Sequence, residues 1–461
     1  MPLIKSLLAI ALLCAMSPFG SADSGSDGAE PKPDAAKDSD SPAAPEVAKA
    51  SSAQEAEPKP LLPAWLKLSA VLRGRYEAPS GTSVANATLD EYYLSRLRLE
   101  VQIKPTPWLR LVAQGQDARA FGYNAVTQPN TIYNPLDLRL AYAEASYEAS
   151  TSVKFRAGRQ ELNFGGGRLV GTPDWGTPAK SYDAMDVTLS RGGAKLDLFA
   201  GSIVWIDPSR FDRHKTGEHL YGAYGSVKGW APGAIVEPYV LFKQALKVTG
   251  EQGGMGDALL VTPGVRVAGQ APNRIDYTAE FAIQRGSYSA DPVSAMAGSY
   301  VAGWTLNDSK IKPRVSLEYN HASGDKSAKD GARGTFDQLY ASNHQYYGIA
   351  DQVGWKNLRN PRIGFDFVAT KRVKLRADFN EFYLATTQDG LYNASGTRTV
   401  LNTHASSRHV GSEADFQVQY QWSEGLQFGI GFARLFAGEY LKQSTKADGY
   451  SYPYVCFTKK F

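Results

Sequence analysis

"YYLSRLRLEVQIKPTPWLRLVAQGQ", residues 92–116, alternates apolar with charged residues, and this alternation decides the fold class. Leu97 and Leu99 fall on one parity, whereas Arg96, Arg98 and Glu100 fall on the other. After a Pro-Thr-Pro turn the alternation resumes. Because successive side chains of an extended strand point to opposite faces, each strand has one apolar and one charged face. The stretch therefore predicts two amphipathic β-strands joined by a tight turn.

The first 60 residues are predicted to lie outside the folded domain. Residues 1–22 combine Lys5, an apolar run and a small-residue site at 20–22, which is typical of a secretory signal peptide. Residues 23–60 consist mainly of Ala, Pro, Ser and charged residues and predict a disordered acidic linker, a possible docking segment for a periplasmic partner. The linker holds nine acids and four bases, so the whole-chain charge of +4 leaves a basic domain at 61–461.

Composition excludes several classes of protein. Beyond the signal peptide, the sequence contains no apolar run of the roughly 18 to 20 residues that a membrane helix needs. Only Cys456 remains after processing, which excludes a disulfide framework and a cysteine metal site. We expect no metal, no cofactor and no nucleic-acid partner, and a monomer.

About eighteen alternating runs lie between Trp65 and Phe461, and their joints alternate in length. Short joints are expected near 105–106, 149–151, 191–193, 229–233, 270–273, 306–311, 371–372 and 423–424, and mostly longer ones near 78–90, 121–136, 163–180, 205–216, 245–257, 287–293, 323–359, 386–410 and 438–449. An up-and-down meander with tight turns at one end and loops at the other is typical of bacterial outer-membrane barrels.

Aromatic residues support this fold. Five of the eight tryptophans lie at or beside short joints, as an interfacial girdle requires: Trp65, Trp108, Trp230, Trp304 and Trp422. The chain ends on Phe461, with Phe457 and Val455 on the same parity. This ending resembles the terminal strands of outer-membrane barrels, which implies recognition by the barrel-assembly machinery.

The direction of the two faces follows from the cost of charge in lipid. An Arg or Lys facing the bilayer centre costs roughly 2 to 4 kcal/mol, so the leucines must face lipid and the arginines a lumen. A soluble β-sandwich would bury the leucines instead, but eighteen strands would leave open edges that barrel closure removes. We therefore predict an all-β, transmembrane, up-and-down antiparallel barrel of about 18 strands in the outer membrane, with both termini periplasmic.

Strand parity and motif matches place a set of charged residues in the lumen. The predicted electropositive, substrate-binding residues are Arg73, Arg75, Arg96, Arg98, Arg110, Arg159, Arg168, Arg314, Lys374 and Arg376. The predicted counter-charges are Glu77, Glu100, Glu280, Glu318 and Asp378. Such arginines either brace the wall through bidentate carboxylate pairs or create a field that selects anions, and the sequence leaves both open. The net positive charge of the domain favours the second.

Enzyme signatures are weaker. The stretch "GGGRLVG" at 165–171 lacks the Lys-Ser/Thr pair of a phosphate loop and predicts only a glycine-rich loop. A barrel hydrolase would need a histidine beside a nucleophile or carboxylate, for which His219 and His321 are candidates.

Several stretches resemble the alginate-export outer-membrane family. They are "RGRYE" at 73–77, "GRQEL" at 158–162, "GGRLVGTPDW" at 166–175, "YDAMD" at 182–186, "EYNHASGD" at 318–325, "FDQLY" at 336–340 and "GIADQVGWKN" at 348–357. The resemblance implies a passive pore with an electropositive constriction that attracts the carboxylates of an anionic polysaccharide. It implies this role for Arg73, Arg75, Arg96, Arg98, Arg159 and Arg168.

The sequence thus predicts a passive outer-membrane channel, and not an enzyme, for an alginate-like polyuronate or a related anionic solute. An uptake porin for other small solutes and, from a different class, a barrel hydrolase are the alternatives.

Overall fold

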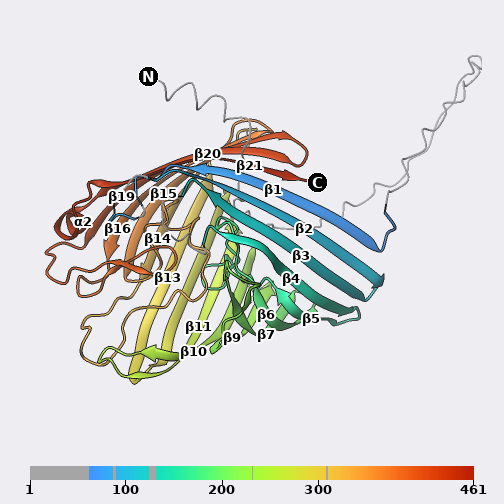
Figure 1. Cartoon of the computed structure of the whole chain (residues 1–461), viewed down its shortest axis with the longest axis horizontal. Helices are drawn as coiled ribbons and strands as arrows, with labels where there is room; N and C mark the ends of the chain where they lie inside the picture. The colour runs from blue at the N-terminus through green and yellow to red at the C-terminus, as the bar shows by residue number, and fades with distance from the viewer. Residues whose placement is uncertain (1–61, 82, 87–89, 124–130, 231, 308–309) are drawn as a thin grey trace, which may run out of the picture.

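The computed structural model shows a closed antiparallel barrel of eighteen strands (Figure 1). It describes residues 62–461 except 82, 87–89, 124–130, 231 and 308–309, so the predicted signal peptide and linker lie outside the described residues. The barrel strands are β1 (Leu66–Glu77), β2 (Tyr92–Thr106), β3 (Leu109–Phe121), β4 (Asn134–Tyr147), β5 (Ser152–Gln160), β6 (Tyr182–Arg191), β7 (Ala194–Trp205), β9 (Glu218–Lys228), β10 (Ala234–Thr249), β11 (Met255–Ala271), β12 (Ile275–Tyr288), β13 (Asp291–Thr305), β14 (Arg314–Ala322), β15 (Leu358–Val368), β16 (Val373–Leu384), β19 (His409–Ser423), β20 (Leu426–Ala437) and β21 (Gly449–Lys460).

Four short elements lie outside this wall. β8 (Arg213–His214) pairs with the end of β7, and β17 (Leu391–Tyr392) pairs with β18 (Arg398–Val400) in a separate two-stranded sheet. Helix α2 (Glu439–Ser444) lies between β20 and β21. The described residues contain no helix that is both long and apolar enough to cross a membrane.

The first and last strands close the barrel. β1 pairs with β21 from Val71↔Lys460 to Glu77↔Tyr454, and the two strands lie side by side in Figure 1. The terminal residue takes part, since the Phe461 amide donates to the Ala70 carbonyl at 2.9 Å. Closure leaves no open edge, so backbone polar groups pair throughout a wall that faces lipid.

The two faces of each strand have the polarity predicted from the sequence. Leu97 and Leu99 on β2 are 39% and 55% exposed on the outer surface, whereas Arg96 and Arg98 are 2% and 9% exposed inside. The five tryptophans beside short joints are all more than half exposed, as a girdle requires, while Trp175 and Trp355 are buried. The outer wall is apolar, and the charges of β2 point inward.

The joints follow the predicted alternation of short and long, with two exceptions. The loop expected near 245–257 is only residues 250–254, because β10 extends to Thr249 and β11 begins at Met255. The loop expected near 287–293 is a two-residue turn at Ser289 and Ala290, because β12 and β13 stay paired up to Tyr288↔Asp291. Ser289 has a φ of 57°, which a two-residue hairpin of this kind needs.

Two long joints fold into the barrel and fill much of its interior. The first lumen loop (residues 161–181) follows β5, and the second lumen loop (residues 323–357) follows β14. They pair with each other in parallel at Val170 and Tyr340, with the Tyr340 amide donating to the Leu169 carbonyl at 2.8 Å. Trp355 of the second loop is fully buried. The packed core of this protein therefore lies inside the barrel, between loops and wall.

Candidate functional site: a lumen closed by two interlocked loops

Arginines of β1 and β2 converge on one carboxylate of the first lumen loop. The register places Arg73 directly opposite Arg96, an arrangement of like charges that destabilises a strand pair unless a counter-ion is shared. Asp174 is that counter-ion: its Oδ1 accepts from Arg96 Nη1 and from Arg98 Nη1, both at 2.8 Å, and its Oδ2 accepts from Arg96 Nη2 at 3.0 Å. Arg73 donates to the Asp174 carbonyl and, at 3.1 Å, to that of Trp175.

Asp174 is held in its ionised form by these contacts. Burial opposes ionisation of its carboxyl group, but the guanidinium groups of Arg96, Arg98 and Arg73 outweigh that cost and hold its pKa well below the usual value. The loop is thus fastened to the wall by a charge that persists over the whole physiological pH range.

Two more guanidinium groups border this cluster. Arg75 lies 3.9 Å from the centre of the Trp175 ring, donates to the Trp175 carbonyl at 2.7 Å and forms an ion pair with Glu77. Arg139 of β4 donates to Gln114 at 2.8 Å and pairs with Glu161 of the first lumen loop. We define Arg73, Arg75, Arg96, Arg98 and Arg139 as the arginine cluster. Its five positive charges meet the carboxylates of Asp174, Glu77 and Glu161, so the cluster is cationic.

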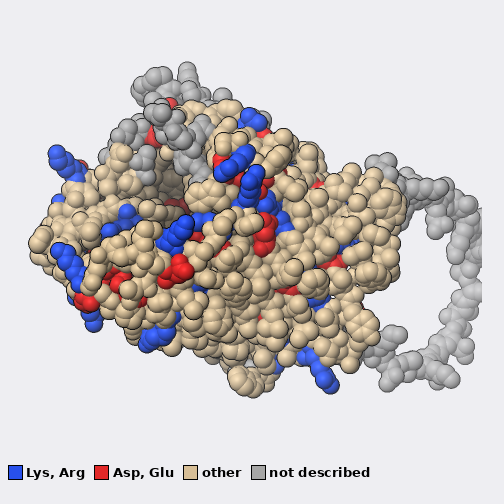
Figure 2. Space-filling model, turned by 60° about the horizontal axis from the view of Figure 1, so that its bottom comes forward, with Lys and Arg blue, Asp and Glu red and all other residues tan. Residues whose placement is uncertain are grey.

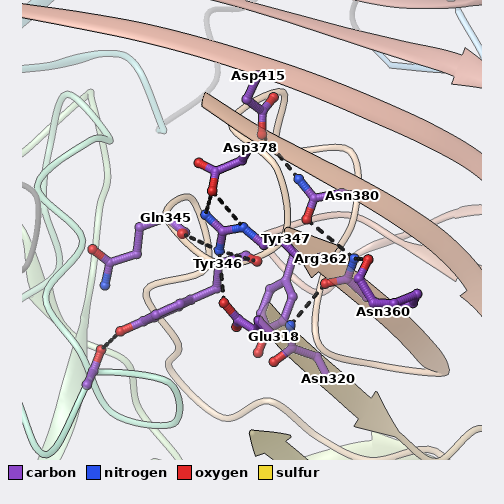
Figure 3. A network of polar contacts seen from close by, with 12 residues as sticks. Glu318, Asn320, Gln345, Tyr346, Tyr347, Asn360, Arg362, Asp378, Asn380 and Asp415 are labelled. Atoms are coloured by element: carbon purple, nitrogen blue, oxygen red, sulfur yellow. Dashed lines mark hydrogen bonds and ion pairs between the residues drawn. The ribbon is translucent and has the colours of Figure 1, made fainter. Parts of the chain in front are cut away.

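A second ionic network joins both lumen loops to β14 and β15, and Figure 3 shows the part of it around Arg362 and Glu318. Arg168 of the first loop donates to Glu318 of β14 at 2.6 Å and to the Tyr347 hydroxyl at 3.0 Å, and it stacks 3.7 Å from the Tyr346 ring centre. Arg362 of β15 contacts the other Glu318 oxygen at 3.2 Å. The planar guanidinium groups therefore connect strands and loops that are far apart in the sequence.

The remaining residues predicted for the lumen also have partners on the inner wall, except Lys374 and Arg159. Three arginines form ion pairs: Arg110 with Glu144 at 2.9 Å, Arg314 with Asp276 at 2.7 Å and with Asp366 at 3.0 Å, and Arg376 with Asp378 at 2.6 Å. Two carboxylates accept hydrogen bonds: Glu100 from Gln102 and Gln114, and Glu280 from Tyr239. Lys374 is exposed, and the described residues provide no carboxylate partner for it.

The predicted lumen position of Arg159 is wrong. In the register Arg159 lies opposite Ala141 and Asp183, on the same face of β5 as Phe155, which is 42% exposed on the outer surface. Its Nε donates to Asp183 at 2.8 Å, near the end of the strand where an outward charge can be solvated. The family motif "GRQEL" therefore supplies an ion pair at the outer rim instead of a lumen charge.

Sequence reasoning missed three residues of the site. For Arg362 the signal was present, because Ile363 beside it continues the outward apolar parity, whereas a bulge in β4 turns both Leu138 outward and Leu140 inward, so strand parity could not place Arg139. Asp174 carries no periodic signal, since it lies in a loop.

One cavity beside the lumen loops is small and of mixed charge. A cavity of about 210 Å³ lies between the two lumen loops and the wall, bordered by the carboxylates of Asp174, Asp378 and Asp415 and the guanidinium groups of Arg362 and Arg376. Figure 2 likewise shows basic and acidic side chains interspersed over the face that it presents. The cation excess therefore belongs to the arginine cluster and not to the cavity lining.

A carboxyl group at the loop end of the barrel fixes the second lumen loop. Glu251, between β10 and β11, accepts from the Gly331 amide at 3.2 Å, and its own amide donates to Asp291 at 2.7 Å. Burial, together with the neighbouring carboxylates of Asp325 and Asp291, raises the pKa of Glu251 to about 7.

The two histidines predicted as hydrolase candidates, His219 and His321, show limited catalytic geometry, whereas His344 and His409 lie 2.9 and 3.0 Å from the carboxylates of Asp351 and Glu381. His219 Nδ1 lies 2.7 Å from Ser202 Oγ, but among the described residues no carboxylate is hydrogen-bonded to His219, and Ser202 is only 8% exposed. His321 lies on β14, opposite Arg359 on the outer face. Within the part of the chain that the structure describes, no group of three or more His, Cys, Asp or Glu side chains has the arrangement of a metal site.

Comparison with protein families gives one match, described as alginate export, over residues 64–454. The chain belongs to the alginate export family. Two of the stretches that resemble this family build the lumen contacts described above: "GGRLVGTPDW" supplies Arg168 and Asp174, and "EYNHASGD" supplies Glu318. No curated protein matched the chain.

Solved structures of outer-membrane channels share the fold. Pseudomonas aeruginosa OccK5 (OpdH) aligns with a TM-score of 0.59 at 10% identity, over 86% of this chain and 98% of that one. P. aeruginosa OccK3 (OpdO) aligns with a TM-score of 0.57 at 12% identity, over 86% and 95%. P. aeruginosa OpdK, solved with vanillate, aligns with a TM-score of 0.57 at 10% identity, over 86% and 98%. The protein is an outer-membrane barrel of the porin type and a passive channel.

Proposed function

We propose that this alginate export family barrel passes an anionic saccharide, such as a polyuronate or its fragments, with the arginine cluster as its attracting site. The observation that carries the proposal is the excess of positive charge in that cluster, where five guanidinium groups meet three carboxylates. Guanidinium groups remain charged at any physiological pH and bind carboxylates through two parallel hydrogen bonds. A uronate carboxylate can replace Asp174 as the shared counter-ion.

This exchange would couple binding to opening. Because the Asp174 side chain holds the first lumen loop against β1 and β2, an anionic cargo that takes over Arg96 and Arg98 also releases the loop. The cavity between the lumen loops and the wall holds about 210 Å³, less than the roughly 300 to 1,000 Å³ of a drug-sized pocket. Passage of a polymer therefore requires that the loops move.

The lengths of the joints support a proposed orientation of the barrel in the membrane. We place the tight turns, the linker and both termini on the periplasmic side and the long loops outside, as in barrels with short periplasmic turns. The linker, residues 23–60, would then be free to bind a periplasmic partner.

The experiment is ion flow through purified protein in planar bilayers, with added oligouronate as a blocker. We expect preference for anions and block by the oligouronate, but no block by a neutral oligosaccharide of equal length. Replacing Arg96 and Arg98 together by Glu should weaken or reverse the preference while the barrel still assembles. Equal block by both sugars would contradict the proposed cargo.

An uptake channel for small carboxylated solutes is the second candidate. The size of the cavity favours it, because the closed loops leave room for a small solute but not for a chain. A small carboxylate that permeates proteoliposomes faster than any oligouronate would select this alternative.

A further inference from the structure

Arginines recur on the lipid-facing side of the barrel, close to the strand ends at the end of the barrel that carries the long loops. They are Arg119 on β3, Arg159 on β5, Arg285 on β12, Arg359 on β15 and Arg434 on β20, each within three residues of the end of its strand. Their outward direction follows from strand parity. Arg285 shares its face with Phe281, which is 40% exposed, and Arg434 shares its face with Phe432, which is 46% exposed.

The location of these arginines near the strand ends determines how deep their side chains lie in the membrane. An outward-facing arginine is strongly unfavourable at the middle of a bilayer and nearly neutral in energy near the interface. The apolar band below them, for example Ile430 and Phe432 on β20, is exposed to the acyl chains. The guanidinium groups therefore lie at head-group level.

Two of the five arginines are already neutralised on this face. Arg119 forms a bidentate pair with Asp117, at 2.8 and 2.9 Å, and Arg159 pairs with Asp183. An anion from outside would have to displace these carboxylates.

The other three arginines have only neutral partners among the described residues. Arg285 donates to the carbonyl of Gln284 at 2.7 Å, and Arg434 donates to Ser451 Oγ at 2.8 Å. Arg359 is exposed between the cross-strand neighbours His321 and Tyr383, and the described residues provide no carboxylate partner for it. Each guanidinium group therefore keeps its full charge, together with donors that suit a phosphate.

The spacing of these three residues is regular. The wall runs β12, β13, β14, β15, β16, β19, β20, so Arg285, Arg359 and Arg434 are each three strands apart. At about 4.8 Å per strand, neighbouring guanidinium groups are separated by roughly 14 Å along the rim. One lipid head group fits at each position.

We propose that Arg285, Arg359 and Arg434 form a collar that binds the phosphate groups of anionic lipids in the outer leaflet. The partner is a lipid whose acyl chains lie on the apolar wall and whose phosphate accepts from the guanidinium group, as basic residues near membrane surfaces do. The inference rests on the orientation given under the proposed function, with the long loops outside. It does not depend on what passes through the lumen.

The test is native mass spectrometry of the detergent-solubilised barrel with a diphosphorylated glycolipid and with the same lipid after dephosphorylation. The wild type should retain the phosphorylated lipid far better. Replacing Arg285, Arg359 and Arg434 together by Gln should weaken retention by about fivefold for each arginine. Arg119→Gln is the matched control, because it lies on the same face and at the same level but already has a carboxylate partner, and it should match the wild type.

A variant with lysine at all three positions keeps the charge and should retain much of the binding, which separates charge loss from misfolding. Equal retention of the phosphorylated and dephosphorylated lipids by the wild type would overturn the proposal, as would full retention by the glutamine variant. The readout involves no ion flow, so failure of the collar and failure of the proposed cargo are observed separately.

Discussion

Replacing Asp174 by Asn is the change that tests the lumen most sharply. Asn has the same shape and keeps an oxygen acceptor, and the backbone carbonyls that bind Arg73 and Arg75 are unaffected. The arginine cluster then loses one of its three carboxylates, and the lumen gains one positive charge beside Arg96 and Arg98. A unit charge acts on a monovalent ion at 4 Å with about 1 kcal/mol in a water-filled lumen. The anion gains this energy and the cation loses it, a difference of about 2 kcal/mol. Since each 1.4 kcal/mol is tenfold, the anion-to-cation permeability ratio should rise about thirtyfold.

The assay is the reversal potential of a planar bilayer under a salt gradient, before and after the substitution. Asp117→Asn is the matched control, because Asp117 also pairs with an arginine but lies on the outer face. It should leave the reversal potential unchanged. An unchanged or lower anion preference in Asp174→Asn, with the loop still protected from protease, would refute the reasoning that Asp174 masks the cluster.

Three further results are expected from single changes. Arg168→Lys should increase current noise and lower the thermal stability of the barrel, because lysine cannot both pair with Glu318 and stack on an aromatic ring. Breaking a buried ion pair costs about 3 to 5 kcal/mol. A melting curve like that of the wild type, together with a quiet current, would contradict this prediction. Because the pKa of Glu251 is raised in the folded protein, the folded second lumen loop favours the protonated carboxyl group. The stabilisation that protonated Glu251 gives to this loop is therefore lost as the pH rises from about 4.5 to about 7. Limited proteolysis at Lys329, in the second lumen loop, should therefore increase over that range in the wild type but not in Glu251→Gln. Deleting Phe461 should slow membrane assembly, measured by heat-modifiable migration, whereas an equal assembly rate would exclude recognition through this residue.

The wall of the barrel was predictable from the sequence because its physical cause is local. Lipid outside and water inside impose a period of two on every strand, so Arg96 and Leu97 fall on opposite faces whatever the distant residues are. The alternation of short and long joints then gives the meander without any knowledge of tertiary contacts. The same reasoning placed Arg73, Arg98 and Arg110 inside.

The interior was not predictable, because its contacts join segments far apart in the chain. Arg168 meets Glu318 across 150 residues, and Asp174 meets Arg96 across 78. Neither loop has a periodic pattern that would have indicated a position inside the barrel.

Arg159 shows a different limit. The stretch that contains Arg159 resembles the family, but this resemblance does not show which way the side chain points. The alternation along β5, counted from the outward-facing Phe155, would have shown that Arg159 points outward.

The selectivity of the unmodified channel tests the central claim most directly. The full mature chain in a planar bilayer under a potassium chloride gradient should give a reversal potential closer to the equilibrium potential of chloride than to that of potassium, because the arginine cluster leaves the lumen cationic. A reversal potential closer to the equilibrium potential of potassium would contradict the account.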